Sequence, residues 1–275
     1  MTTLSQAGEL GLLAELEQRG LIAGVEHDAA RVGRDLVVTQ DALVDGVHFR
    51  LDWITWHELG FRAAAVNLSD LAASGATPEG FVVTLAAPGT TATGDVIALY
   101  EGIAETGVPV IGGDTTAARD VLVSVTALGR SARVPGRDGA QPGDLLVVTG
   151  PLGAAGAAFR RKQYVRPPLR LEEGRRLAAS AHALMDVSDG LAVDAAHIAR
   201  RSGVRCVIEL ADVPLANGAL LEDVGFGEDF ELLAAVQEPG GCDVIGRVEA
   251  GEGVELLLDG EPYELGGWQH FAAGP

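Results

Sequence analysis

The chain has 275 residues, 47% of them hydrophobic and 21% charged, which is the composition of a globular protein with room for two medium-sized domains. Its formal net charge of −19 at pH 7 argues against a surface for nucleic acid or for an anionic membrane, so we expect neither partner. Lys162 is the only lysine, and the absence of a G-x-x-x-x-G-K-[ST] motif excludes a Walker-type phosphate loop.

The N-terminal segment, residues 1–20, is typical of an amphipathic helix, because it contains acidic residues and lacks a basic leader region. We therefore expect no signal peptide. No apolar run in the sequence approaches the roughly 18 residues needed to span a bilayer. The resulting expectation is a cytoplasmic protein.

Strands and helices alternate along the first half of the chain. Residues 35–44 are rich in β-branched side chains and predict a strand, whereas residues 56–76 are rich in Ala and Leu and predict a helix. The pattern then predicts a strand at 79–87, a helix at 92–107, and strands at 108–116 and 120–130.

A stretch dense in Gly, Pro and Arg, residues 131–144, has no apolar periodicity and is the best candidate for a domain boundary. We expect an N-terminal domain at 1–135 and a C-terminal domain at 136–275. In the second domain we expect a strand, a glycine turn and a helix at 145–160, a helix at 189–203, strands at 204–212, 230–236 and 242–250, and a terminal hairpin at 254–265. The fold class is therefore α/β or α+β.

Four segments place aspartates beside small residues at the edge of an apolar element. Their aspartates are Asp41, Asp70, Asp114, and the group Asp186, Asp189 and Asp194 in "MDVSDGLAVD". Carboxylates are costly to bury unless they are paired or bind a metal. The segments are therefore candidates for one functional site.

Each aspartate taken alone has a structural alternative. Asp41 or Asp114 could form a turn or cap a helix, and Asp189 could cap the helix that follows it. Asp70 satisfies no cap, because it lies within a helix and shares one face with Asn67. Several hard oxygen ligands without a cysteine pattern favour Mg²⁺ over Zn²⁺, and Mg²⁺ held by scattered carboxylates usually also holds a substrate's phosphates.

Seven motifs, in this order, resemble those of the thiamine-monophosphate kinases: "VNLSDLAASGA", "GGDTT", "RDGAQPGD", "VTGPLG", "DVSDGLAVD", "GEDFELL" and "GWQHF". That family belongs to the superfamily of aminoimidazole ribonucleotide synthetase, and the resemblance runs from about residue 24 to residue 271. It implies a homodimer of two-domain chains of the aminoimidazole ribonucleotide synthetase type. It also implies phosphoryl transfer from ATP to thiamine monophosphate, giving thiamine diphosphate.

The resemblance also assigns residues by motif match. It implies that several Mg²⁺ ions are held by Asp28, Asp41, Asp70, Asp114 and Asp186. It implies that the nucleotide lies against Thr39, Gln40, Gly113, Asp114, Thr115, Arg137 and Ser188. The group at the transferred phosphate would be Arg137, Ser188 and Asp189, and the thiamine phosphate pocket would be lined by His48, Asp189, Glu228 and Trp268.

Several of these residues have structural alternatives. His48 could be a structural histidine, and Trp268 could anchor the C-terminal segment by packing. The charges of "GEDFELL" could be structural or could line the cleft, and Asp194 could only brace its loop. The glycines of "VTGPLGAAG" could cradle a phosphate at a helix N-terminus, but close helix packing is the favoured interpretation.

The N-terminal part departs from the family pattern. Glu26 and His27 stand where Gly and Asp are usual, which makes a non-catalytic nucleotide-binding paralogue an alternative. Another ATP-using enzyme of the superfamily is a second alternative. Selenophosphate synthetase would carry a reactive Cys or selenocysteine in an N-terminal glycine-rich segment, and the hydrogenase maturation factor would end in Cys, whereas this sequence shows neither feature.

Overall fold

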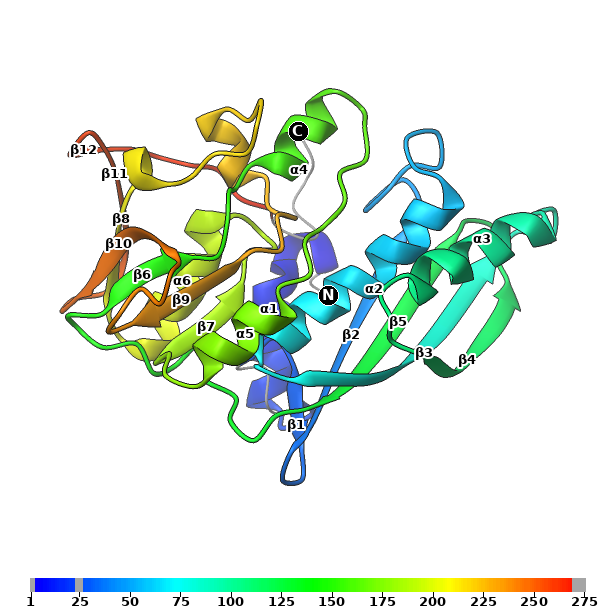
Figure 1. Cartoon of the computed structure of the whole chain (residues 1–275), viewed down its shortest axis with the longest axis horizontal. Coiled ribbons are helices and arrows are strands. Elements are labelled where there is room, and N and C mark those ends of the chain that lie inside the picture. Colours follow the sequence, from blue (N-terminus) through cyan, green and yellow to red (C-terminus); the bar gives the residue numbers. More distant parts are fainter. Residues whose placement is uncertain (1–2, 23–26, 269–275) are drawn as a thin grey trace.

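The computed structural model describes residues 3–22 and 27–268 and places them in two β-sheets with helices packed on them (Figure 1). The first half of the chain builds one sheet and the second half builds the other. This architecture confirms the predicted α/β class. Within the described ranges, no helix is long and apolar enough to cross a membrane.

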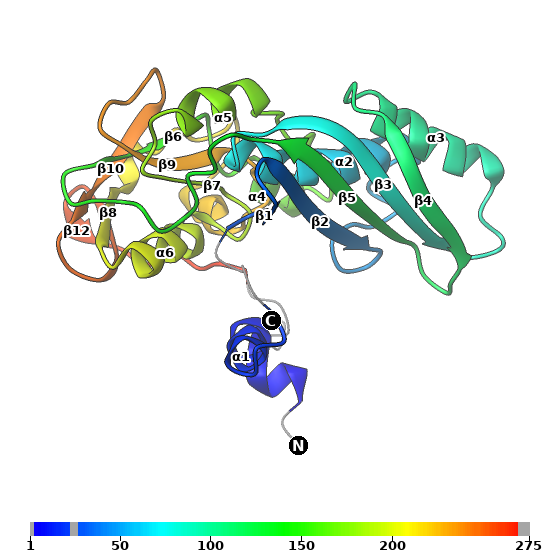
Figure 2. The same cartoon turned by 90° about the horizontal axis from the view of Figure 1, so that it is seen from below.

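The N-terminal helix α1 (Leu4–Gln18) confirms the helix expected there, although its backbone breaks at Gly8, where φ is 64°. Figure 2 shows α1 set apart from both sheets.

The first sheet has five strands in the order β1-β2-β5-β3-β4. They are β1 (Ala30–Val32), β2 (Leu36–Val44), β3 (Thr77–Ala87), β4 (Val110–Ala117) and β5 (Leu122–Arg130). Only β3 and β4 pair in parallel. Helices α2 (Trp56–Ala73) and α3 (Thr93–Ala104) cover one face, as Figure 2 shows, and alternate residues of β5 such as Val123 and Val125 are buried beneath them. The opposite face carries no helix in the part of the chain that the structure describes.

Helix α2 begins at a capping box and packs on α3 through two glycines. The Thr55 hydroxyl accepts from the Glu58 N–H at 3.2 Å, and the Glu58 carboxylate accepts from the Thr55 N–H at 2.8 Å. A Cβ on Gly60 would lie 1.8 Å from the Leu99 carbonyl oxygen, and one on Gly102 would lie 1.9 Å from that of His57. The two helix backbones therefore touch, and no larger side chain fits at either crossing point.

The second sheet has seven strands in the order β12-β11-β8-β10-β6-β9-β7. They are β6 (Leu145–Val148), β7 (Ala183–Asp186), β8 (Arg205–Glu209), β9 (Leu232–Val236), β10 (Asp243–Glu249), β11 (Gly253–Leu258) and β12 (Glu261–Pro262). Its helices are α4 (Ala154–Arg160), α5 (Leu171–Ala178) and α6 (Leu191–Ser202), with short 3₁₀ turns η1 (Leu210–Asp212) and η2 (Leu221–Gly225).

Helix α2 also contacts the second half of the chain, where it packs on α5 and β7. A Cβ on Gly174 of α5 would lie 2.2 Å from the carbonyl oxygen of Ala72, so these two helices also meet backbone to backbone. Because α2 is shared by both sheets (Figure 1), a polar residue on it, such as Asp70, lies where the two halves meet.

Most elements lie where the sequence predicts them. The helix expected at 189–203 is α6, and the terminal hairpin turns at Asp259 and Gly260, whose φ values are 53° and 80°. The candidate boundary at 131–144 contains no helix or strand. Helix α5 was not predicted from the sequence, because it is short and polar on most of its surface.

Candidate active site

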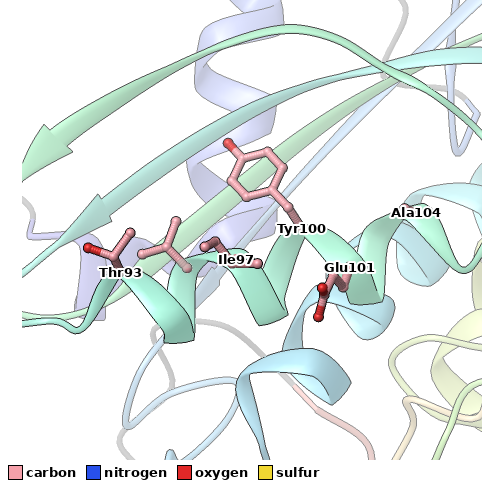
Figure 3. Close-up of a pocket in the computed structure, with 6 residues that line it drawn as sticks. Thr93, Ile97, Tyr100, Glu101 and Ala104 are labelled. Carbon is pink, nitrogen blue, oxygen red and sulfur yellow. The ribbon is translucent and has the colours of Figure 1, made fainter.

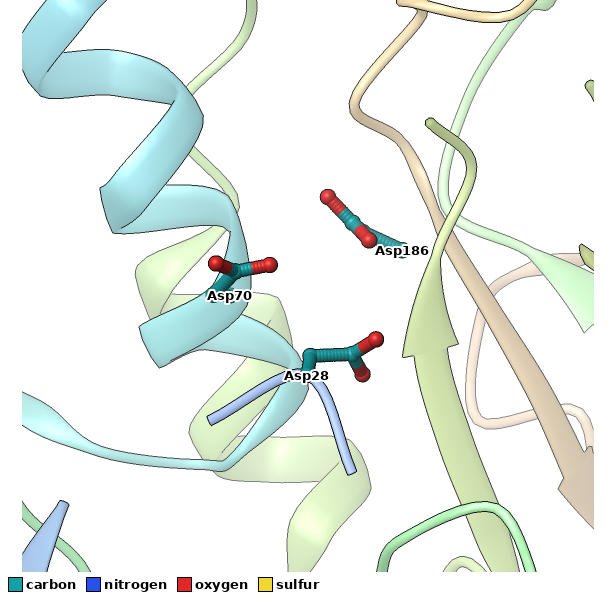
Figure 4. Close-up of side chains that lie close together, drawn as sticks. All are labelled: Asp28, Asp70 and Asp186. Carbon is teal, nitrogen blue, oxygen red and sulfur yellow. The ribbon is translucent and has the colours of Figure 1, made fainter. Parts of the chain in front are cut away.

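Three carboxylates from distant parts of the chain meet between the two halves (Figure 4). Asp28 precedes β1, Asp70 lies on α2, and Asp186 is the last residue of β7. One oxygen of each carboxylate lies within 4.8 Å of those of the other two. Asp28 and Asp186 are nearly inaccessible to solvent, with 4% and 2% exposure.

Neighbouring side chains hold this cluster in place. Thr39 of β2 donates a hydrogen bond to Asp70, and Ser69 of α2 donates one of 2.6 Å to Asp186. The guanidinium of Arg137 binds Asp28 through Nε at 3.2 Å and also through Nη2. Among the described residues, the guanidinium of Arg137 is therefore the one cation bound to the three carboxylates.

Burial is the main cause of the raised pKa values of Asp41, Asp70 and Asp186, and neighbouring carboxylates add to it. Burial, followed by the charge of Asp28, raises the pKa of Asp186 to about 8. Burial and the charges of Asp41 and Asp186 raise the pKa of Asp70 well above its usual range. Asp41, beside Asp70 on β2, has a pKa raised to about 6, chiefly by burial. Buried oxygen ligands with uncompensated charge suit a hard divalent cation such as Mg²⁺.

The loop after β7 is braced by Asp194. Its Oδ2 accepts hydrogen bonds from the backbone N–H groups of Ser188, Asp189 and Gly190 at 3.0, 3.1 and 3.1 Å. Gly190, not Asp189, occupies the N-cap position of α6. Asp194 therefore fixes the backbone that presents Ser188 and Asp189, as the structural alternative from the sequence proposed.

The glycine turn before α4 is already occupied by a carboxylate of the chain. Asp229 accepts from the Gly153 N–H at 2.6 Å and from the Ala155 N–H at 3.2 Å. A Cβ on Gly156 would lie 2.8 Å from that of Asp223. These contacts support the close-packing interpretation of "VTGPLGAAG" over a phosphate cradle.

Of the charges in "GEDFELL", two are structural. Asp229 caps α4, and Glu231 binds Arg170 at 2.6 and 2.7 Å and accepts from Thr149 at 2.6 Å. Glu228 instead pairs with Arg62 of α2 across the boundary between the halves. Both Glu228 and Phe230 have positive φ, 58° and 53°, a strain of roughly 1–3 kcal/mol each that persists only where the surroundings impose it.

A cavity of about 930 Å³ opens between the two halves. Its wall contains seven of the residues assigned by motif, namely Gln40, Asp41, His48, Ser188, Asp189, Glu228 and Trp268. Two contacts support the structural alternatives for His48 and Trp268: the His48 ring accepts from the Val44 N–H at 3.1 Å, and the backbone N–H of Trp268 donates to the Asp189 carbonyl at 2.9 Å. The motif residues that follow Trp268 lie outside the described part of the chain.

Sequence reasoning missed four further residues of this wall: Trp53, Arg62, Phe159 and Phe226. The ring of Phe159 lies 5.7 Å from that of Trp53 and 4.9 Å from that of Phe226, measured between centroids. No local pattern identifies them, since each comes from a different segment and only tertiary structure joins them.

The "GGDTT" motif lies away from the carboxylate cluster within one chain. Asp114 of β4 lies opposite Thr84 of β3, Thr84 lies opposite Ser124 of β5, and Ser124 lies opposite Ala42 of β2. Asp114 is therefore three strands away from β2. At about 4.8 Å per strand this row spans about 14 Å. Gly113, Asp114 and Thr115 are all exposed on the edge strand β4, so the single chain does not bring them to Asp28, Asp70 and Asp186.

His27, which stands where the family has Asp, packs its ring against Gly136, where a Cβ would lie 2.2 Å from His27 Cε1. Its Nδ1 is buried and has no hydrogen-bond partner among the described residues. Glu26, the other departure from the family pattern, lies outside the described residues.

A second hollow, of about 380 Å³, lies on α3 between residues such as Ile97, Tyr100 and Glu101 (Figure 3). Its lining includes a single carboxylate, that of Glu101. It therefore lacks the chemistry of the larger cavity.

Comparison with known proteins shows which family the chain resembles. The family models for AIR synthase related protein match the chain with the N-terminal domain at residues 26–131 and the C-terminal domain at 141–259. The thiamine-monophosphate kinase of Mycobacterium tuberculosis is 35% identical over 98% of this chain and 93% of its own length, and that of Aquifex aeolicus is 31% identical over 98% and 99%. The solved structure of AaThiL complexed with AMPPCP and TMP superposes with a TM-score of 0.90, 32% identity, and coverage of 98% and 99%.

Proposed function

We propose that the chain phosphorylates thiamine monophosphate with ATP to give thiamine diphosphate. The chain belongs to the AIR synthase related family and, within it, to the thiamine-monophosphate kinases. The observation that supports this proposal most directly is that nearly the whole chain superposes on AaThiL, which was solved in complex with AMPPCP, an analogue of ATP, and TMP. In this chain a cavity of about 930 Å³ lies between the two halves, with Asp41, Ser188 and Asp189 in its wall, and Asp41 lies beside Asp70 of the carboxylate cluster.

Mg²⁺ is part of the proposal. Asp28, Asp70 and Asp186, with Asp41 beside them, would hold it, since all four offer hard oxygens and Arg137, on Asp28, is the one cation bound to them among the described residues. When bound, such ions would neutralise phosphate charge that a protein of net charge −19 otherwise repels. Phosphoryl transfer mostly needs alignment and charge neutralisation, so little covalent participation by the protein is needed.

The chain's own residues would supply the alignment. Ser188 and Asp189 stand on a loop that Asp194 fixes through three hydrogen bonds, and we place the transferred phosphate beside them. Arg137 would keep Asp28 in position and offer its remaining N–H groups to phosphate oxygens. Thr39 would orient Asp70, and Gln40, whose amide contacts Ser124 on the open face of the first sheet at 3.3 Å, would contact the nucleotide.

A homodimer is also part of the proposal. Every residue of the edge strand β4 is exposed, including Ile111 at 62%, and a long exposed edge with apolar side chains is unusual in a monomer. A second copy docked on the helix-free face of the first sheet would cover β4. The Gly113, Asp114 and Thr115 of that second copy could then reach the nucleotide bound by the first. Sedimentation of the wild type as a dimer, and of Ile111→Lys as a monomer, would support this arrangement, whereas a monomeric wild type would contradict it.

The enzymatic proposal is tested by incubating purified protein with ATP, Mg²⁺ and thiamine monophosphate and measuring thiamine diphosphate by chromatography. Nucleotide binding without product at any Mg²⁺ concentration would favour the non-catalytic paralogue. A cytoplasmic location stays a prediction.

A further inference from the structure

The loop at residues 136–140, which contains Arg137, has no helix or strand and runs along the second half of the chain. The Gly136 carbonyl accepts a 2.8 Å hydrogen bond from the backbone of β7. A Cβ on Gly139 would lie 2.2 Å from the His182 carbonyl oxygen, so the two backbones touch at that point. These contacts place the flanks of the loop, and a side chain of helix α6 closes it.

Ser202, the last residue of α6, closes this loop with a single hydroxyl group. Its Oγ donates to the Arg137 carbonyl at 3.0 Å and accepts from the Ala140 N–H at 3.1 Å. A serine in a helix can instead bond to a carbonyl of its own helix. Here the hydroxyl spends its donor and an acceptor on the loop, which fixes the separation of Arg137 and Ala140 across the turn.

Helix α6 supports both loops that we place beside the phosphates. Asp194, in its first turn, holds the backbone of residues 188–190 through the three hydrogen bonds described above. Ser202 lies eight positions further along, which is about 12 Å of helix. Leu191 and Ile198 anchor α6 in the core of the second half, where both are buried. One anchored helix therefore sets the spacing of the two loops.

The side chain of Arg137 reaches from its loop to the first half of the chain. Its Nε lies 3.2 Å from Oδ1 of Asp28, and its Nη2 also binds this oxygen. The side chain of Arg137 is 18% exposed, so the pair is largely shielded from water. Because Ser202 holds the carbonyl of Arg137 itself, its hydroxyl determines the backbone position from which the guanidinium reaches Asp28.

We propose that Ser202 is a positioning residue for phosphoryl transfer, because its hydroxyl closes the loop and so holds the Arg137 guanidinium at Asp28 and at the phosphate. This inference rests on the proposed function and deepens it. Ser202 acts through Arg137, and its role needs no contact of its own with a substrate. An enzyme that works mainly by alignment loses rate when such a support is removed, even if the groups of the site are all present.

Replacement of Ser202 by Ala tests this role by separating kcat from KM. With ATP and Mg²⁺ saturating, kcat should fall about 10–100-fold, the usual effect of losing a partner that orients a site residue. KM for thiamine monophosphate should stay within about twofold of wild type, since the alignment of the guanidinium matters most in the transition state. Ser202→Thr keeps the hydroxyl and should restore most of the lost kcat.

Exchange of the Arg137 Nε–H with water reports on the same contact without any turnover. This N–H is hydrogen-bonded to Asp28, so in protein labelled with isotopic arginine it should give a slowly exchanging nuclear magnetic resonance signal. Arg137→Lys identifies the signal by its absence. In Ser202→Ala the exchange should be faster, and in Ser202→Thr it should be close to that of the wild type.

Two further variants separate this role from a loss of stability. Ser131→Ala removes a 2.7 Å hydrogen bond from a buried serine to the Arg133 carbonyl, and it should lower the melting temperature without changing kcat or the Nε–H signal. In the Arg137→Lys background, which lacks the bidentate fork, Ser202→Ala should change kcat less than about twofold, because the group that Ser202 positions has been removed.

The positioning role would be overturned by unchanged kcat or unchanged Nε–H exchange in Ser202→Ala, or by a Ser202→Thr variant as impaired as Ser202→Ala. An equal loss of kcat in Ser131→Ala, or an undiminished effect of Ser202→Ala in the Arg137→Lys background, would also overturn it. A wild type without kinase activity would sink the proposed function, and the exchange comparison would still decide whether Ser202 holds Arg137. Active protein with unchanged exchange would sink the role of Ser202 alone.

Discussion

Ser69 of α2 donates a 2.6 Å hydrogen bond to Asp186 at the end of β7, so the two halves of the chain are joined at a carboxylate of the candidate metal site. Both side chains are buried, with 2% exposure each. The contact means that the position of Asp186 depends on how α2 packs against the second sheet.

Replacement of Ser69 by Ala should therefore weaken metal binding. Without its hydrogen bond, Asp186 keeps its charge less readily and is less well oriented, and loss of such a supporting contact typically costs 10–100-fold in metal affinity. Titration of Mg²⁺ followed by the shift in melting temperature measures the effect. Ser180→Ala, at an exposed position, is the control, and equal Mg²⁺ affinity in all three proteins would contradict the assigned role of Ser69.

Asp70→Asn should abolish turnover and leave the fold intact. The substitution removes a buried charge that no ion pair among the described residues compensates, so the metal-free variant should melt at a higher temperature than the wild type. Added Mg²⁺ should stabilise the variant less than it stabilises the wild type. Persistence of full activity would show that Asp70 holds no essential metal.

The stability of the metal-free protein should fall as pH rises from about 4 to about 8. Asp41 and Asp186 have folded-state pKa values of about 6 and about 8, above the value of about 3.9 for an unfolded aspartate. In this window the folded state binds more protons than the unfolded state, so the free energy of unfolding decreases with pH. Stabilisation by Mg²⁺ should increase over the same window, because the ion binds the deprotonated carboxylates. Urea unfolding at several pH values, with and without Mg²⁺, checks both slopes, and flat profiles would contradict the assigned charge state of the cluster.

Gly156→Ala separates the packing role of the α4 glycines from phosphate binding. A new Cβ would lie 2.8 Å from that of Asp223, so unfolding should require about 1–3 kcal/mol less free energy. The affinity for AMPPCP should stay within about twofold of wild type. Gly94→Ala, where a Cβ meets nothing within 4 Å, is the control, and a selective loss of nucleotide affinity in Gly156→Ala would restore the cradle interpretation.

Much of this site was predictable because its signals are local. Asp70 has no capping role in an apolar helix, and Asp186 ends a buried strand. The sequence pattern alone therefore predicts that both are functional residues. The family resemblance added Asp28, which has no such signal. The pairing of Arg137 with Asp28 could not be predicted, because 109 positions separate the two residues.

The remaining features depend on tertiary or quaternary structure. Trp53, Phe159 and Phe226 share no periodicity and become neighbours only in the folded chain, where α4 packs against η2. The place of Asp114 depends on strand order, which puts β4 at the edge of the sheet and leaves its nucleotide role a prediction that needs a second copy.

Direct measurement of the product tests the central claim. Purified protein, ATP, Mg²⁺ and thiamine monophosphate should yield thiamine diphosphate in proportion to enzyme, and the same mixture with Asp70→Asn should yield none. Absence of thiamine diphosphate from the wild-type reaction, or phosphorylation of thiamine in place of its monophosphate, would contradict the account.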